Sequence, residues 1–120
     1  MTSALNSEAA IRALYAAFNR RDIDAVLARM HPDVAWPNGW EGGVVVGRAA
    51  VRDYWTRQWA AIDPTVNPAE ISTDADGKVS VVVRQVVKDR GGAVLSDGLV
   101  RHIYAFDGGL IAAMEIRKDG

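Results

Sequence analysis

The chain has 120 residues, 49% of them hydrophobic and 24% charged, and we expect residues 1–120 to form one ordinary globular domain. Fourteen basic and fifteen acidic residues give a net charge of −1, without the excess of positive charge that proteins binding nucleic acid or anionic membranes use. We therefore expect neither nucleic acid nor a membrane as a partner. Because the chain lacks cysteine, it can form no disulfide, no thiolate metal site and no cysteine nucleophile. The N-terminal residues have no basic and apolar signal pattern, which predicts a cytoplasmic protein.

The first half of the chain predicts three helices, because apolar residues recur there every three or four positions. The first apolar stripe runs from Ile11 to Phe18. The second runs from Ile23 to Met30, with Asp22 as its N-cap and His31-Pro32 at its end. The third predicted helix lies between Gly47 and Asp63-Pro64 and is marked by Val51, Tyr54, Trp55, Gln58, Trp59 and Ile62. Residues 34–36 are a short strand candidate, followed by a glycine-rich loop.

The second half predicts an antiparallel sheet. The turn signals Asp76-Gly77, Arg90-Gly91-Gly92 and Asp107-Gly108-Gly109 separate four runs rich in strand-forming residues, 66–73, 78–88, 93–106 and 110–118. Helices followed by a strand meander predict an α+β domain, with the N-terminal helices packed on one face of a curved, mainly antiparallel sheet.

The register of the last hairpin decides what lies beside His102. A three-residue loop, 107–109, would pair His102 with Met114 and Arg101 with Glu115, whereas a two-residue loop would pair His102 with Glu115. The first alternative gathers the apolar residues of both strands on one face with His102, and we prefer it for that reason.

Four segments of the sequence match the pattern of a known protein superfamily: LYAAFNRRDIDAV (14–26), HPDVAW (31–36), GRAAVRDY (47–54) and YAFDGGLI (104–111). They resemble the nuclear transport factor 2-like superfamily, particularly its SnoaL-like and ketosteroid-isomerase-like members. The resemblance covers nearly the whole chain and implies a cone-shaped α+β barrel that encloses a mostly apolar pocket, and a homodimer. It does not specify an activity, because the superfamily holds isomerases, cyclases, dehydratases, epoxide hydrolases and non-catalytic members.

The catalytic positions of the ketosteroid isomerases are occupied differently in this chain. By the resemblance, Asn38 falls at the general-base aspartate, and His102 at the strand carboxylic acid of the oxyanion hole. Leu14 falls at the oxyanion tyrosine, with Tyr15 next to it, and Trp55 at a supporting tyrosine. Asn38 cannot accept a proton and Leu14 cannot donate one, which excludes steroid isomerisation of that type. SnoaL-like cyclases use a histidine, an asparagine and an acidic base in the pocket, and no residue here is assigned to that base.

Two residues are therefore candidates for catalysis. His102 is the one group on its apolar strand face that exchanges a proton near neutral pH, although a buried histidine satisfied by its neighbours is the competing interpretation. Asn38 has an amide that could orient a carbonyl oxygen, and it is equally a turn residue in Pro37-Asn38-Gly39. The two interpretations of Asn38 are compatible.

The candidate substrate-binding residues are mostly aromatic, which predicts a pocket for a ring-containing ligand. Core packing is the competing interpretation and is favoured for Tyr15 and Trp59. The candidates are Tyr15, Trp36, Trp40, Trp55, Tyr104 and Met114.

An Arg–Asp arrangement like that of the epoxide hydrolases in this superfamily would need Arg84, Asp97, Arg101 or Glu115. Strand alternation turns Asp97 and Arg101 away from His102 unless Gly98 marks a bulge, so we expect solvated charges on the outer face. The sequence has no GxGxxG, GxxxxGK[ST] or GxSxG motif, and its two histidines lack metal-ligand spacing. We expect no metal and no cofactor.

Two functions follow from these features. The first is a protein that binds a small hydrophobic molecule, with an isomerase, cyclase or lyase activity in which His102 is the acid or base and Asn38 orients the polar end. The second is a non-catalytic dimeric binding or accessory module. The tryptophans and the single histidine favour the first, and the missing base favours the second.

Overall fold

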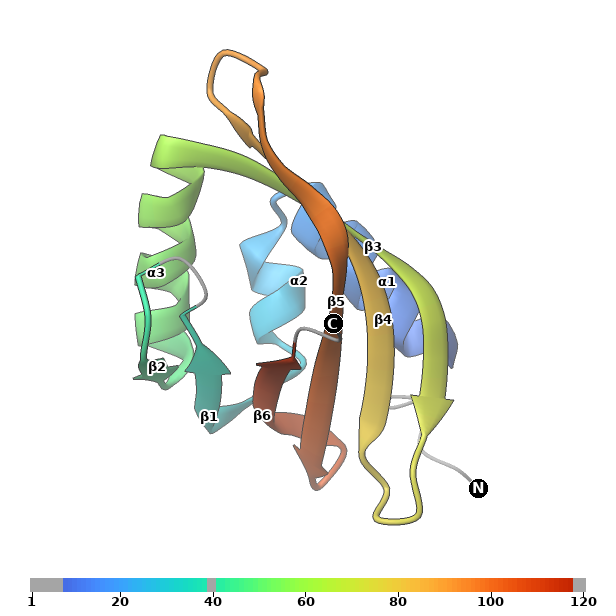
Figure 1. Ribbon diagram of the computed structural model, residues 1–120. Helices are drawn as coiled ribbons and strands as arrows, with labels where there is room; N and C mark the ends of the chain where they lie inside the picture. The colour runs from blue at the N-terminus through green and yellow to red at the C-terminus, as the bar shows by residue number, and fades with distance from the viewer. Residues whose placement is uncertain (1–7, 39–40, 118–120) are drawn as a thin grey trace.

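The computed structural model describes residues 8–38 and 41–117, which form three helices and a six-stranded curved sheet (Figure 1). The helices are α1 (Glu8–Asn19), α2 (Ile23–Leu27) and α3 (Arg48–Ala61). The strands are β1 (Met30–Pro37), β2 (Val44–Val46), β3 (Ile62–Thr73), β4 (Val79–Asp89), β5 (Val94–Asp107) and β6 (Leu110–Arg117). None of the helices in these ranges is both long and apolar enough to cross a bilayer. The predicted α+β class is confirmed.

The sheet has the strand order β2-β1-β6-β5-β4-β3 and is antiparallel except for the parallel pair β1–β6. Its two edges, β2 and β3, do not pair with each other. Helix α3 contacts both edge strands as well as β1, while α1 contacts β3. The helices therefore cover one side of the sheet, and α3 bridges its open side.

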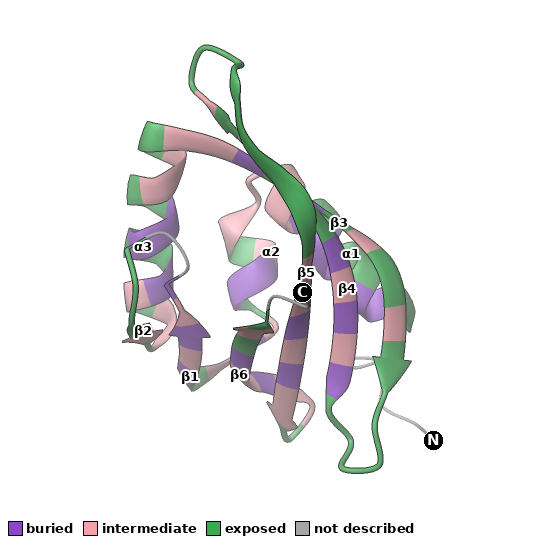
Figure 2. Cartoon of the chain, viewed as in Figure 1, coloured by how far each residue is buried: buried purple, intermediate pink, exposed green. Residues whose placement is uncertain are grey.

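The core lies between this covered face and the helices, and alternation along β4 shows how the sequence directs it there. Val79, Val81 and Val83 are fully buried, whereas Arg84 is exposed, as expected when successive side chains point to opposite faces of a sheet. The lower part of β5 shows the same banding, while its first half, toward the β4–β5 turn, is exposed (Figure 2).

The predicted second helix is shorter than its apolar stripe. Asp22 does cap α2, its side chain accepting a hydrogen bond from Ala25 N–H at 3.2 Å, but the helix ends at Leu27. Met30 instead begins β1, and His31 lies in that strand, so the prediction that His31-Pro32 ends a helix is wrong. The side chain of Met30 is fully buried, and helical spacing alone cannot distinguish a buried helix position from a buried strand position.

Strand β1 is also longer than the predicted segment 34–36, and β2 was not predicted. Pro32 has no N–H and lies in the stretch of β1 between its two paired positions on β6, Met30–Ile111 and Ala35–Ala113. A strand with such an interruption carries a weak local signal.

The preferred register of the last hairpin is wrong, and the alternative with a two-residue loop is right for the loop and its first two pairs but not for His102. The loop has two residues, Gly108 and Gly109, both with positive φ (60° and 83°), the combination that a type I′ turn needs. One residue later in the ladder, between the pairs Phe106–Ile111 and Ala105–Ala113, β6 has a bulge at Ala112. Beyond the bulge His102 pairs with Ile116 rather than with Met114 or Glu115.

The bulge adds one residue, so it returns the strands to the face assignment of the predicted register. Tyr104 pairs with Met114, and both side chains are buried on the face that carries His102. The apolar pattern therefore predicted the face correctly, although the pairing partners are displaced by two residues.

Candidate functional site

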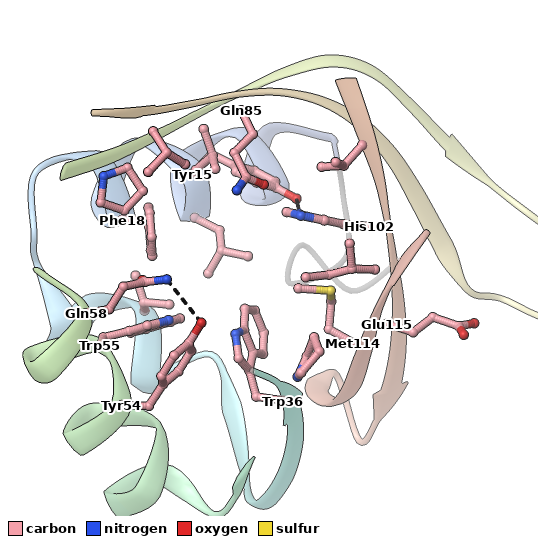
Figure 3. Close-up of a pocket in the computed structure, with 18 of the residues that line it drawn as sticks. Tyr15, Phe18, Trp36, Tyr54, Trp55, Gln58, Gln85, His102, Met114 and Glu115 are labelled. Atoms are coloured by element: carbon pink, nitrogen blue, oxygen red, sulfur yellow. Dashed lines mark hydrogen bonds between the residues drawn. The ribbon is translucent and has the colours of Figure 1, made fainter. Parts of the chain in front are cut away.

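A cavity of about 600 Å³ lies between the helices and the sheet. Every helix and every strand of the described chain contributes to its lining, which is mostly aromatic and aliphatic (Figure 3). The volume is within the range of sites for small organic ligands, about 300–1,000 Å³.

The cavity brings together most of the predicted binding residues, which come from α1, α3, β1, β5 and β6. Trp40 lies outside the described residues. The others line the cavity and are all less than 9% exposed: Tyr15, Trp36, Trp55, Tyr104 and Met114.

The aromatic side chains contact one another through their edges as well as lining the cavity. The rings of Trp36 and Trp55 are 5.4 Å apart at an interplanar angle of 87°, and Phe18 meets Trp55 edge-on at 5.3 Å. Trp59 stacks on Trp55 at 5.7 Å but is not in the lining, which agrees with core packing for Trp59. Edge-to-face contacts hold the rings of this wall in defined positions.

His102 is the last member of a buried hydrogen-bond chain. The Tyr104 hydroxyl donates to Tyr15 Oη at 2.7 Å, and Tyr15 Oη lies 2.7 Å from His102 Nδ1. Within residues 8–38 and 41–117, the hydroxyl hydrogen of Tyr15 has no other acceptor, so it goes to Nδ1. A neutral imidazole carries one N–H, and here that hydrogen is on Nε2.

All three groups of the chain are neutral near pH 7. Burial lowers the pKa of His102 to about 4, because the imidazolium would lose its hydration. Burial also raises the pKa of Tyr104, and it raises that of Tyr15 together with the neighbouring Tyr104. Within the described residues, no group hydrogen-bonds to Nε2 of His102. This N–H therefore ends the hydrogen-bond series from Tyr104, and a ligand in the cavity can accept from it.

Asn38 is buried at 6% exposure, but it is not in the described lining of the cavity. Its Oδ1 accepts the Glu41 N–H at 2.7 Å and its Nδ2 donates to Glu41 Oε1 at 3.0 Å. Glu41 in turn binds Arg57 of α3, and this hydrogen bond is the main reason why the pKa of Glu41 is lowered. The predicted turn includes Gly39, which lies outside the described residues, and a contact of Asn38 with the ligand stays a prediction.

Several polar residues that were not predicted as site residues also line the cavity, among them Tyr54, Gln58 and Gln85. Nε2 of Gln58 donates to Tyr54 Oη at 3.1 Å. Both glutamines left a signal in the sequence, because Gln58 interrupts the apolar stripe of α3 and Gln85 follows Val79, Val81 and Val83 at the same strand parity.

Carboxylates are on the outside of the sheet. Glu115 is the one acidic residue in the described lining, and Figure 3 shows its side chain pointing away from the cavity. This side chain is 53% exposed and binds Arg117. Asp97 receives two hydrogen bonds from Arg84, at 3.0 and 2.8 Å, on the exposed face. The expectation of outer-face charges is confirmed for this pair.

A family model described as the SnoaL-like domain matches residues 11–114. The chain belongs to this SnoaL-like family. No curated protein sequence matches it. Among solved structures, the SnoaL-like chain is similar to TerC, co-crystallised with polyporic acid, with 28% identity and a TM-score of 0.78 over 91% of this chain and 88% of that one.

Two further structures share the fold. An NTF2-like protein of unknown function from Burkholderia pseudomallei has 25% identity and a TM-score of 0.78, over 91% of this chain and 87% of its own. A Mycobacterium tuberculosis protein in complex with estradiol-17β-hemisuccinate has 20% identity and a TM-score of 0.78, over 91% and 90%. The implied cone-shaped fold is thereby confirmed.

Proposed function

We propose that this SnoaL-like protein binds a hydrophobic, ring-containing small molecule, and that Nε2–H of His102 donates a hydrogen bond to a carbonyl oxygen of that molecule. The observation that carries the proposal is the chain from Tyr104 through Tyr15 to His102. Its hydroxyl groups satisfy one another and Nδ1, and leave one N–H at the cavity. A donor held in this way needs no reorganisation when an oxygen arrives.

The aromatic wall supports a ring-containing ligand, because flat rings pack well against the faces and edges of Trp36 and Trp55. The ligands of similar structures support the same class. TerC was crystallised with polyporic acid and the Mycobacterium tuberculosis protein with estradiol-17β-hemisuccinate.

The protonation states favour binding over proton abstraction. With a pKa near 4, His102 is a weak base at pH 7, and the carboxylate of Glu115 points to solvent. His102 is therefore proposed as a hydrogen-bond donor rather than as the general acid or base expected from the sequence. The second candidate is an isomerase-type or cyclase-type reaction in which a water molecule takes the proton from the carbon next to the carbonyl while this donor stabilises the enolate oxygen, and the preformed donor chain is the observation in its favour.

Tryptophan fluorescence tests the proposal, because Trp36 and Trp55 line the cavity. The probes are estrone and the matched pair 9-fluorenone and fluorene, which differ by one carbonyl oxygen. The wild type should bind fluorenone about tenfold more tightly than fluorene, about 1.4 kcal/mol, and His102→Leu should abolish this preference. His31→Ala, on β1 outside the cavity lining, is the control and should retain it.

If none of the probes binds to folded wild-type protein, the proposal is wrong. Equal binding of fluorenone and fluorene would mean that the cavity binds ring systems but that His102 does not donate a hydrogen bond to the carbonyl oxygen. The catalytic candidate predicts that the protein accelerates deuterium exchange at the carbon next to the estrone carbonyl, which NMR measures directly. Absence of acceleration in a protein that binds estrone would leave a binding function alone.

We also propose that the protein is a cytoplasmic homodimer, as expected from the sequence. Leu95 and Leu99 are 58% and 61% exposed on the outer face of β5, on either side of Asp97 and its ion pair with Arg84. Two opposite charges flanked by apolar side chains can be self-complementary across a two-fold axis, where the same patch meets itself. A second copy of the chain is therefore the proposed partner of this face.

A further inference from the structure

Another polar side chain lines the cavity, from the helix side. Gln58 lies on α3, and its Nε2 is used in the hydrogen bond to Tyr54. Its carbonyl oxygen Oε1 is buried and has no hydrogen-bond partner within residues 8–38 and 41–117. A buried carbonyl oxygen without a donor is unfavourable, so this atom needs a partner that the described chain does not supply.

The other buried side-chain atom of the described residues without a partner is Nε1 of Trp59, and Trp59 is not in the lining of the cavity. Gln58 therefore combines two properties that are separate elsewhere in the described chain: an unpaired buried acceptor and a place in the cavity wall. Nε2 is the amide atom that contacts Tyr54, and Oε1 is the end without a partner.

Gln58 and His102 lie on different sides of the cavity. Figure 3 shows Gln58 with Tyr54 on the α3 side and His102 with Tyr15 on the opposite side. Their polarities are also opposite, because His102 presents an N–H donor and Gln58 a carbonyl acceptor. The side chains around the space between them are largely apolar.

We infer that Oε1 of Gln58 accepts a hydrogen bond from a hydroxyl group of the ligand, at the end opposite the oxygen held by His102. This inference rests on the proposed function and narrows its ligand class. The ligand is a rigid ring system with an acceptor oxygen at one end and a hydroxyl donor at the other. Tyr54 is a positioning residue, because its hydroxyl accepts the hydrogen bond from the amide of Gln58.

A steroid series with one varied group tests this directly. Estrone has a ketone at one end and a phenolic hydroxyl at the other, 3-deoxyestrone lacks the hydroxyl, and estrone 3-methyl ether keeps the oxygen but has no donor. Isothermal titration of the wild type should give about tenfold weaker binding for both analogues than for estrone, as expected for one buried acceptor left unpaired.

Two variants locate the effect. Gln58→Met, of similar size but without the acceptor, should bind estrone and 3-deoxyestrone within about twofold of each other. His102→Leu should weaken all the ketones but keep the preference for estrone over 3-deoxyestrone, because it acts at the other end. Circular dichroism melting curves check that each variant is folded, and the wild-type ligand series stands without any variant.

The failures are distinguishable. Equal wild-type affinity for estrone and 3-deoxyestrone, or a preference that persists in Gln58→Met, overturns the inference and leaves the proposed function intact. Tighter binding of the methyl ether also overturns it, because the amide would then present its N–H. Binding of fluorenone without binding of estrone overturns the ligand class inferred here, whereas binding of neither overturns the proposed function first.

Discussion

Acidification should destabilise this fold through His102. The side chain is 6% exposed and its pKa is about 4 in the folded state, against an ordinary value of 6.5 that applies to the unfolded chain. The unfolded chain therefore binds this proton more readily than the folded one. The contribution of His102 to stability is fully present above pH 6.5 and is lost as the pH falls from 6.5 through about 4.

The size of the effect follows from these two pKa values. The gap between 6.5 and about 4 corresponds to about 3 kcal/mol when both states have titrated fully. Between pH 7 and pH 5, a window above the ordinary pKa of carboxylates, the same linkage predicts a loss of about 2 kcal/mol. That is a large fraction of the stability of a domain of this size.

Urea unfolding at pH 7 and pH 5, followed by tryptophan fluorescence, measures this loss. The variant His102→Leu removes the titrating group but retains every other one, including His31. The wild type should lose about 2 kcal/mol more than the variant between the two pH values. The imidazole of His102 should in addition titrate near pH 4 in an NMR pH series of the folded protein.

Equal losses of stability in the wild type and His102→Leu would refute the reasoning. So would an NMR titration of His102 near its ordinary pKa of 6.5. Either result would mean that the cavity hydrates or pairs the imidazolium, and the proposed neutral N–H donor would then be a charged one.

Three further effects should be measurable. Asn19→Ala removes two hydrogen bonds that tie α1 to the backbone of β3 and should cost about 2 kcal/mol in urea unfolding, whereas the exposed Asn67→Ala should cost under about 0.5. Gly47→Ala, at φ 94°, should cost about 1–2 kcal/mol, and Gly98→Ala, whose new Cβ would meet no atom within 4 Å, should be close to neutral; equal costs would contradict the strain argument. Leu99→Arg should convert a proposed dimer to a species near 13.0 kDa in light scattering, and a wild-type mass of 13.0 kDa would reject the dimer.

In the helical half of the chain, the local sequence pattern predicted the first helix and the cap of the second, but not where the second helix ends. The stripe from Ile11 to Phe18 and the cap at Asp22 both lie where periodicity and capping chemistry predicted them. Met30 was assigned to a helix because a buried apolar position looks the same in a helix and in a strand over so short a run. The missed strand β2 consists of three valines, which favour a strand, but three residues are too short a run to predict one without the pairing with β1.

The last hairpin separates two kinds of information. The alternation of apolar residues is strong enough to assign Tyr104, His102 and Met114 to one face. The pairing depends on a two-residue turn and on a bulge at Ala112, each of which shifts the pairing by one residue in the same direction. The total shift of two residues changes the partner of each side chain but leaves it on the same face. The face was therefore predictable, and the partner of His102 was not.

For the candidate site, the sequence by itself determined the fold family, the inward-facing histidine, and most of the aromatic residues of the cavity wall. Gln58 and Gln85 were visible as polar residues within apolar patterns. The tertiary structure alone decided how these groups combine. It joins His102 to Tyr15 across 87 positions of sequence and Tyr15 to Tyr104 across 89, and it leaves Oε1 of Gln58 unpaired across the cavity. Local periodicity determines the face on which a side chain lies, whereas its hydrogen-bond partner and its pKa depend on which distant element packs against that face.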